Sequence, residues 1–300
     1  LDDLHSLYET NRARLTGQGA EALIVTDSSL DAAKLIALNA RNTGSITVSA
    51  TNITGSTADI KTALTNADGG NGVVTGLAAN ITVTTTGTTV AAADLNDIRG
   101  VNGGGAEVGL TTGLVTIGTD ATTISGNAAE TKEAFVSTNP PVTDPVTPVR
   151  IAGLGTLAAS VSGSVALADI NTIAAATTGV LTCTGADGTL AAYTHATTGL
   201  LESGNAISFD LTDNSFNQAA VTSLIALSAK TTGTITLDPA DDSASPAISA
   251  TMADLLTVFA DAGIAGKGGA TGTVTISDAG SVNAADLKTL NTAVTPALVA

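Results

Sequence analysis

Short stretches of the chain alternate apolar with small polar residues, and each is followed by a run with helical periodicity. In "TGTVTISDAGSVNAADLKTLN" (271–291), Val274 and Ile276 alternate with threonine, and a polar turn precedes the helical run. A period of two predicts a strand that is buried on one face, and the run after the turn predicts an amphipathic helix. The stretch therefore predicts a strand, a polar link and a helix.

Similar stretches recur along the chain. We count nine, which cover 22–38, 45–64, 80–98, 113–135, 156–173, 179–197, 206–227, 233–259 and 271–291. Their mean spacing of roughly 31 residues is typical of solenoid repeats. Because a helix returns the chain after each strand, successive strands are expected to lie parallel. The sequence predicts an α/β repeat solenoid of about nine strand-turn-helix units, with helices on one face of a parallel sheet; the alternative is a β-helix or β-solenoid with short helices.

The predicted helix starts carry a capping side chain three residues before a carboxylate. The pairs are Ser56 with Asp59, Asn127 with Glu130, Thr251 with Asp254, and Asn283 with Asp286. At this spacing each side chain can accept a hydrogen bond from the backbone of the other residue, and the carboxylate lies at the positive end of the helix dipole. These residues are therefore expected to cap helices.

Five aspartates occupy the same place in an Ala-Asp-(Leu/Ile) triplet. They are Asp59, Asp94, Asp169, Asp254 and Asp286. A row of equivalent carboxylates is also compatible with catalysis or metal binding, but one carboxylate per repeat favours helix caps. The apolar residue that follows, Leu287 in the last triplet, is expected to lie between helix and sheet.

Proline density divides the chain. Four of the seven prolines fall in residues 138–149, which predicts a linker or a long loop. One repeat block is expected at 21–137, and a second at 150–300 that either ends there or continues in a longer chain. Residues 1–20 lack the repeat pattern and are expected to form a terminal cap or a helix that docks a partner.

Composition narrows the function. The chain is 43% hydrophobic but has Trp 0, Tyr 2 and Phe 4, so its core must consist of small aliphatic side chains. A formal charge of −16 disfavours binding to nucleic acid or to anionic membrane surfaces. No stretch has the ~20 apolar residues that a membrane span requires.

Chemistry-bearing residues are sparse. The chain has two histidines and one cysteine, Cys183, which is too few for a histidine-based catalytic group or a cysteine zinc site, so neither an enzyme nor a cofactor is expected. Calcium is the exception, since acidic loops supply the hard oxygen ligands that it prefers. The candidate ligands are Asp210, Asp213, Asp238, Asp241 and Asp242; solvated turn carboxylates are the alternative interpretation.

The stretches "LADINTIAAATTGVLT" (167–182) and "VTSLIALSAKTTGTIT" (221–236) share an Ala/Thr/Asp-rich pattern. This pattern resembles tandem repeats in very large surface proteins of marine cyanobacteria and in structural proteins of their phages. The resemblance covers most of the chain, apart from the first twenty residues and the proline-rich segment. It implies an extracellular or virion-surface structural role and carries over no catalytic residues.

Two functions from different classes are open at this point. The first is a non-enzymatic structural protein of an extracellular fibre, surface layer or virion exterior, whose partners are further copies of itself or other surface or virion proteins. The second is an adhesin or receptor-binding module that uses irregular acidic and glycine-rich loops at 65–79, 101–112 and 260–272. The scarcity of aromatic residues favours the first, because binding hot spots are enriched in Trp, Tyr and Arg.

Overall fold

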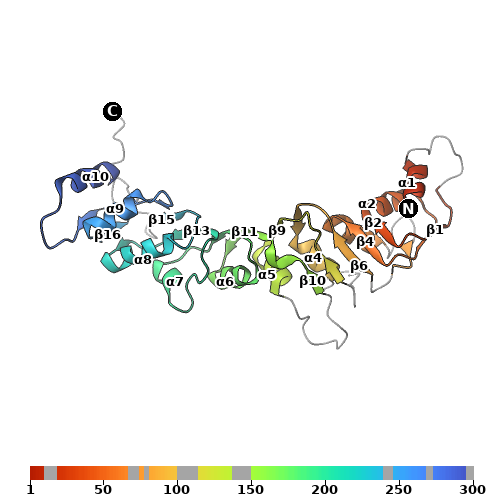
Figure 1. Cartoon of the computed structure of the whole chain (residues 1–300), viewed down its shortest axis with the longest axis horizontal. Coiled ribbons are helices and arrows are strands. Elements are labelled where there is room, and N and C mark those ends of the chain that lie inside the picture. Colours follow the sequence, from red (N-terminus) through yellow and green to blue (C-terminus); the bar gives the residue numbers. More distant parts are fainter. Residues whose placement is uncertain are drawn as a thin grey trace. The chain divides into compact units, whose positions relative to one another are not determined.

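The computed structural model describes residues 1–9, 19–66, 74–77, 81–99, 114–136, 150–238, 246–267 and 273–294. Within these ranges the chain is a mixed α/β protein with ten α-helices and several parallel sheets (Figure 1). It divides into two compact parts. The N-terminal lobe comprises Leu1–Ala159 with Ala176–Gly179, and the C-terminal lobe comprises Ser160–Ala175 with Val180–Ala300. The predicted α/β class with parallel strands is confirmed.

The N-terminal lobe alternates short strands with helices. Its helices are α1 (Asp2–Glu9), α2 (Ala32–Arg41), α3 (Thr57–Asn66), α4 (Ala92–Arg99) and α5 (Ala128–Val136), with a short 3-10 helix η2 (Leu154–Thr156). Its strands are β1 (Leu23–Val25), β2 (Ser29–Asp31), β3 (Ile46–Val48), β4 (Asn52–Gly55), β5 (Val74–Thr75), β6 (Thr82–Thr85), β7 (Thr89–Ala91), β8 (Leu114–Thr116), β9 (Thr123–Asn127) and β10 (Arg150–Ala152).

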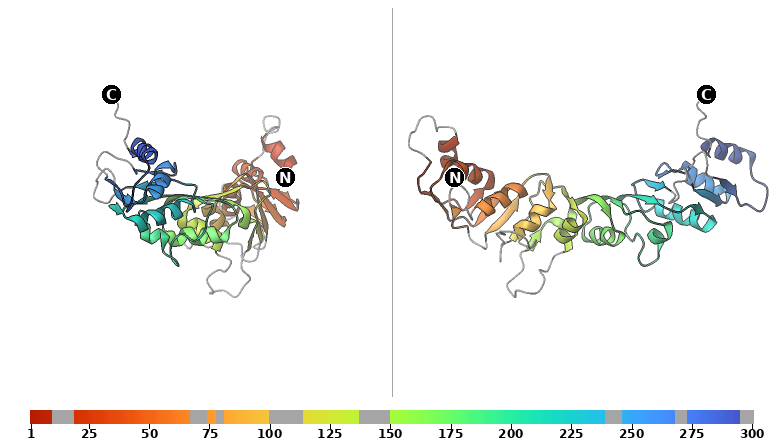
Figure 2. Two further views of the ribbon diagram at one scale, coloured as in Figure 1. Left: turned by 60° about the vertical axis from the view of Figure 1, so that its left-hand side comes forward. Right: turned by 180° about the vertical axis from the view of Figure 1, so that it is seen from behind.

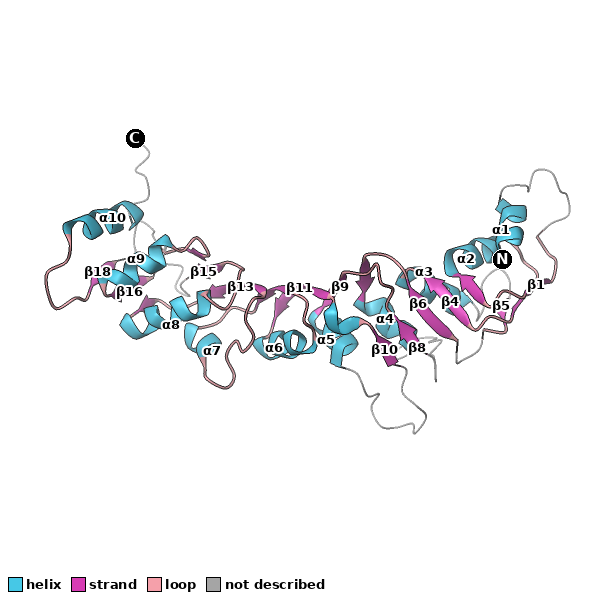
Figure 3. Cartoon of the chain, in the orientation of Figure 1, coloured by secondary structure: helices cyan, strands magenta, loops and turns pink. Residues whose placement is uncertain are grey.

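These strands pair in parallel as three ladders, β1-β3-β5, β2-β4-β6-β8-β10 and β7-β9. In the longest ladder, Leu30, Ile53 and Val83 hold partner positions on consecutive strands, and Val115 follows them on β8. All four side chains are 0% exposed. Figure 3 shows β4 and β6 as neighbouring arrows, so the buried column runs across the ladder.

The C-terminal lobe repeats this arrangement. Its helices are α6 (Leu167–Ala176), α7 (Leu190–Thr194), α8 (Gln218–Ser228), α9 (Met252–Ala260) and α10 (Ala284–Val294). Its strands are most of β11 (Ala158–Val165), then β12 (Leu181–Gly185), β13 (Ala206–Leu211), β14 (Ser215–Phe216), β15 (Ile235–Leu237), β16 (Ala247–Ala250), β17 (Ile264–Ala265) and β18 (Val274–Ile276). The ladders are β11-β12-β13-β15-β17 and β14-β16-β18.

The alternating pattern sets which face of each strand is buried. In β13 the side chains of Ile207, Phe209 and Leu211 are 0% exposed, whereas the small polar residues between them are half-buried. Successive side chains of a strand point to opposite faces, so the period of two in the sequence becomes one apolar and one polar face. The apolar face of each such strand therefore forms part of the core.

The link before several helices differs from the prediction. Between β3 and α3 the chain forms a second strand, β4, and β16 occupies the same place between β15 and α9. Both links carry a buried isoleucine, since Ile53 is 0% exposed and Ile248 is 1% exposed. An apolar residue that is buried in the core holds the link in a parallel ladder of its own. Two ladders rather than one therefore precede these helices.

Helices pack against one another and against strands on either side in sequence. In the N-terminal lobe α3 contacts α2 and α4, and it packs on β4, which precedes it, and on β6, which follows it. In the C-terminal lobe α8 packs on β14 and β16 in the same way. Each such helix is therefore covered partly by the strand that follows it. Figure 2 shows the helices and strands of each lobe from two further directions.

The apolar residue of the Ala-Asp-(Leu/Ile) triplet lies in this layer in four helices but not in the last. Ile60, Leu95, Ile170 and Leu255 are all 0% exposed, whereas Leu287 is 44% exposed. The expectation that Leu287 lies between helix and sheet is wrong. In α10 the buried side chain is Leu290, at 4% exposure. No described strand follows α10 to cover Leu287.

The predicted linker at 138–149 lies outside the described residues. On either side of it, β8 and β10 are parallel partners, with Val115 paired to Ile151. The boundary between the two compact parts falls after Ala159. Chain on both sides of the proline-rich segment therefore contributes to one ladder of the N-terminal lobe.

Candidate functional site

Two of the predicted capping pairs form reciprocal or near-reciprocal contacts. At the start of α5, Asn127 Oδ1 accepts from the Glu130 N–H at 2.9 Å, and Glu130 Oε2 accepts from the Asn127 N–H at 2.9 Å. At the start of α3, Ser56 Oγ accepts from the Asp59 N–H at 3.1 Å and donates to Asp59 Oδ2 at 2.6 Å. These side chains satisfy backbone donors that a helix start leaves without partners.

Two sets of hydrogen bonds hold the start of α9. Thr251 Oγ1 accepts from the Asp254 N–H at 3.4 Å. From α8, Gln218 Oε1 accepts from the Thr251 N–H at 2.6 Å, and Gln218 Nε2 donates to Asp254 Oδ2. Nothing in the sequence pattern singled out Gln218, because the contact joins residues more than thirty positions apart. Its amide ties the first turn of α9 to the first turn of α8.

The last predicted pair caps differently from the prediction. Asn283 Oδ1 accepts from the Ala285 N–H at 2.8 Å, so the asparagine caps α10 through the second helical residue. Asp286 lies in the first turn of α10, and Asp169 lies in the first turn of α6, where its N–H donates to the Ala166 carbonyl at 2.9 Å. Both carboxylates sit at the positive end of a helix dipole.

Asp94 is held by a cation from the neighbouring helix. Lys61 of α3 lies 3.0 Å from Asp94 Oδ1 and 2.5 Å from Asp97 Oδ2, both of α4. The carboxylates of Asp97 and Asp94 raise the pKa of Lys61 above its usual range. The Asp94 carboxylate therefore joins α3 to α4, in addition to its place in the first turn of α4.

A second class of cap joins one strand–helix segment to the next. Asp213, which follows β13, accepts from the Leu190 N–H at the start of α7 at 2.6 Å. Asp278, which follows β18, accepts from the Met252 N–H at the start of α9, also at 2.6 Å. In each case a carboxylate from the following segment caps the preceding helix. We call these two contacts the cross-caps.

A related contact occurs in the N-terminal lobe. Asp120, which follows β8, accepts from the Gly87 N–H at 2.7 Å, in the turn before β7 and α4. Asp120, Asp213 and Asp278 share a signal that sequence inspection can find, because each lies two to four residues beyond the end of a strand. Asp120 and Asp278 lie far in sequence from the groups that they contact, so the helix-cap spacing does not predict their roles.

The three candidate calcium ligands that the structure describes are not gathered into one group. Asp213 forms a cross-cap, and Asp210 lies within β13. Asp238 follows β15, and its N–H donates to the carbonyl of Leu211, the last residue of β13. Asp241 and Asp242 lie outside the described residues. Among the described residues, no three His, Cys, Asp or Glu side chains form a group that could hold a metal ion. For Asp213 the structure favours a structural role over a metal ligand.

Cys183, Tyr193 and Phe209 lie in the C-terminal lobe. The rings of Tyr193 and Phe209 have centroids 4.4 Å apart, and the Tyr193 hydroxyl donates to the Ala186 carbonyl. Burial raises the pKa of Tyr193 to about 12 and the pKa of the Cys183 thiol to about 11. A thiol with a raised pKa is a poor nucleophile at neutral pH, so Cys183 acts as a small apolar core residue.

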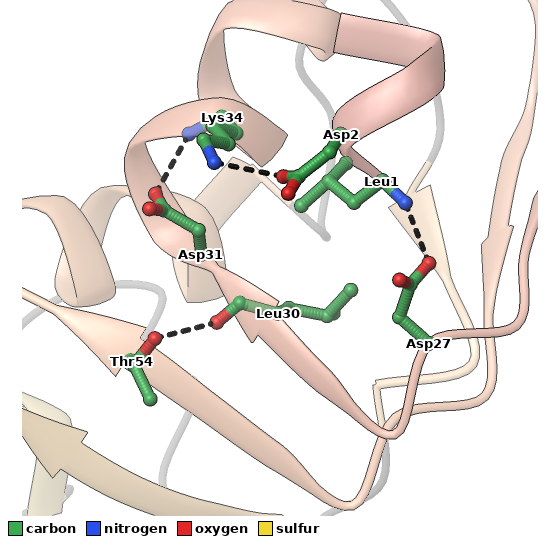
Figure 4. Close-up of polar contacts among 7 residues, drawn as sticks. All are labelled: Leu1, Asp2, Asp27, Leu30, Asp31, Lys34 and Thr54. Carbon is green, nitrogen blue, oxygen red and sulfur yellow. Dashed lines mark hydrogen bonds and ion pairs between the residues drawn. The ribbon is translucent and has the colours of Figure 1, made fainter.

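The first helix is fastened to the second. Asp2 Oδ1 of α1 lies 2.7 Å from Lys34 Nζ of α2, as Figure 4 shows, and Glu9 Oε1 lies 3.0 Å from Arg41 Nε. Between these ion pairs, the hydroxyl of the buried Tyr8 donates to Glu21 Oε2 at 2.7 Å. Helix α1 thus packs on α2, the next helix of the layer. A terminal cap was one of the two expectations for residues 1–20, and this packing fits it.

Comparison with known proteins found no matching family, no matching curated sequence and no matching solved structure. Within the part of the chain that the structure describes, no helix combines the length and apolar character needed to cross a membrane. Many of the polar side chains discussed above are hydrogen-bonded to backbone groups or to each other. Their arrangement fastens successive segments of the chain together.

Proposed function

We propose that this chain is a non-enzymatic structural repeat protein that acts by stacking and self-association. Its nine strand–helix segments form an α/β solenoid in which the helices α7 and α9 are capped by the segment that follows. Its place is an extracellular fibre, a surface layer or the exterior of a virion, and its partners are copies of itself or other proteins of that surface.

The observation that carries this proposal is the cross-cap. Asp213 and Asp278 each close the helix of the preceding segment with a hydrogen bond of 2.6 Å. A carboxylate used in this way is occupied by a backbone amide, which supports a structural role for acidic loops that otherwise suggest ligand binding. Segments joined by such side-chain-to-backbone hydrogen bonds transmit order along the chain.

The core supports the same role. The buried side chains are mostly Ala, Val, Ile and Leu in parallel register, such as the column that contains Ile53 and Val83. Identical small layers stack without change of spacing, so the architecture extends by addition of further segments. A net charge of −16 keeps such an array soluble and disfavours its binding to nucleic acid.

Light scattering of the purified chain over a series of concentrations tests the proposal. The weight-average mass is expected to rise above that of a single chain as concentration increases. A parallel series with a calcium chelator asks whether the acidic loops bridge copies through metal, and loss of assembly there would assign that role to them. A mass that stays at one chain in both series contradicts self-association.

A further inference from the structure

The residue that follows the Ala-Asp-(Leu/Ile) triplet reaches out of its own segment in three helices. It is Lys61 in α3, Asn96 in α4 and Asn171 in α6. The apolar residue just before it is 0% exposed in each of these helices. One further residue turns an α-helix by about 100°, so the next side chain lies beside the buried face and toward a neighbouring helix. We call this place the junction position.

In α3 the junction position reaches the next helix by charge. The Lys61 ammonium lies 3.0 Å from Asp94 Oδ1 and 2.5 Å from Asp97 Oδ2, both of α4. These two carboxylates are three residues apart and lie on one side of α4, so a single ammonium contacts both. All three side chains are half-buried, which lessens the screening of the ion pairs by salt. This junction therefore depends on the side chains of the following segment.

In α4 and α6 the junction position reaches the next segment by an amide. Asn96 Nδ2 donates to the Glu130 carbonyl, in the first turn of α5, at 2.9 Å. Asn171 Nδ2 donates to the Gly199 carbonyl at 2.9 Å, and Asn171 Oδ1 accepts from the Leu201 N–H at 3.1 Å, in the chain that follows α7. The partners in these three bonds are backbone groups. These junctions therefore do not depend on which side chains the following segment carries.

The two remaining triplets differ from these three. In α9 the junction position is Leu256, whose side chain has no polar group and so forms no hydrogen bond or ion pair. There the following segment is joined through the cross-cap from Asp278 to the Met252 N–H. In α10 the junction position is Lys288, which is exposed, and no described helix or strand follows it. Lys288 therefore offers a direct comparison with Lys61.

We propose that a polar junction position selects the segment that packs next in the helical layer. At Lys61 the selection is for sequence, because a following helix pairs with the ammonium when it carries carboxylates in the places of Asp94 and Asp97. At Asn96 and Asn171 the selection is for backbone geometry, because every residue has a carbonyl group. This inference rests on the proposed function, since it names the residues that keep the segments of the structural array in order.

Amide hydrogen exchange on the full chain, followed for single residues by NMR, tests the charged junction. Lys61→Glu places a third carboxylate beside Asp94 and Asp97, so the amides of α4 are expected to exchange at least about tenfold faster. Addition of Asp97→Lys to Lys61→Glu restores opposite charges across the junction and is expected to recover the protection. Lys288→Glu is the matched control, a charge reversal at the same place in the pattern, and is expected to leave the exchange of α4 unchanged.

The same measurement tests the amide junction of α6. Asn171→Leu removes the acceptor of the Leu201 N–H, so this amide is expected to exchange at least about tenfold faster, whereas the amides of α8 keep their protection. Asn171→Asp retains an acceptor oxygen and is expected to keep most of the protection at Leu201. Thr172→Val is the matched control, because the Thr172 hydroxyl donates to the Ala168 carbonyl within α6 itself. It is expected to leave the exchange of Leu201 unchanged.

The outcomes separate this inference from the proposed function. Faster exchange in Lys61→Glu that Asp97→Lys does not recover overturns selection by side chains at the junction of α3 and α4. Equal loss of protection at Leu201 in Asn171→Leu and in Thr172→Val overturns the amide junction, and unchanged exchange in every variant overturns both. Each measurement concerns contacts within one chain, so self-association is decided separately by the light-scattering series.

Discussion

The Asp278 carboxylate accepts a hydrogen bond from the Met252 N–H at 2.6 Å, across 26 residues of chain. Met252 begins α9, whereas Asp278 follows the strand of the next segment. Asp213 and Leu190 repeat this relationship at α7. Helices α7 and α9 are thus each completed by the segment that comes after them, and either helix loses a cap when the following segment is removed.

Asp213→Ala is expected to destabilise the C-terminal lobe by about 1 kcal/mol, because it leaves the Leu190 N–H without its acceptor. Urea unfolding followed by circular dichroism measures this change. Glu202→Ala is the control, an acidic residue of the same lobe that is exposed, and it is expected to be nearly neutral. If calcium raises the melting temperature of the unmodified chain but not of Asp213→Ala, the carboxylate is a metal ligand and the cross-cap interpretation is wrong.

The two leucines that follow Asp254 and Asp286 are expected to respond unequally to truncation. Leu255→Ala removes a fully buried side chain and is expected to cost about 2–5 kcal/mol in the free energy of unfolding. Leu287→Ala truncates a side chain that is 44% exposed and is expected to cost less than about 1 kcal/mol in dilute solution. Chemical denaturation of both variants gives the comparison, and equal costs would mean that α10 is covered like α9.

Both tyrosines of the chain are expected to ionise at a higher pH than a free tyrosine does. Burial raises the pKa of Tyr8 and of Tyr193 to about 12, from an ordinary value of 10.0. Each group disfavours its charged form in the folded state, so its contribution to stability is present below pH 10 and is lost as the pH rises from 10 to about 12. Because the chain has Tyr 2 and Trp 0, tyrosinate absorbance reports on these two groups without interference. Ionisation with a midpoint near pH 10 in the folded chain would contradict their burial.

Cys183 is expected to be inert in the folded chain. Burial raises the pKa of its thiol from 9.0 to about 11, which lowers the thiolate fraction at neutral pH by about 100-fold before access is considered. A disulfide reagent should therefore label it at least about 100-fold more slowly in buffer than in urea. Rapid labelling in buffer would show that β12 opens readily or that its inner face is not covered.

The period of two and the helix-cap spacing were enough to predict the α/β class, the parallel strands and the cap at Asn127 and Glu130. These features depend on residues that are close in sequence. The second strand before many helices was missed, because "TNITG" carries one apolar residue, Ile53, and reads as a polar link. Only the neighbouring Leu30 and Val83, from other segments, explain why it joins a ladder.

The local sequence pattern does not predict the contacts that join one segment to another. Gln218 and Asp278 act on residues 33 and 26 positions away, so their roles depend on how the segments register. The acidity of Asp213 predicts a calcium ligand, whereas its backbone partner lies in a different segment and is not found from the local pattern. The local pattern also does not predict the exposure of Leu287, since its triplet is identical in pattern to four buried ones, and only the absence of a described strand after α10 distinguishes it.

Electron microscopy of the chain, at concentrations where scattering shows assembly, tests the central claim that it is a self-associating structural protein. The account predicts ordered assemblies, in which copies meet at defined contacts and repeat with a constant spacing. Isolated single chains throughout the field, in the presence and in the absence of a calcium chelator, would contradict it.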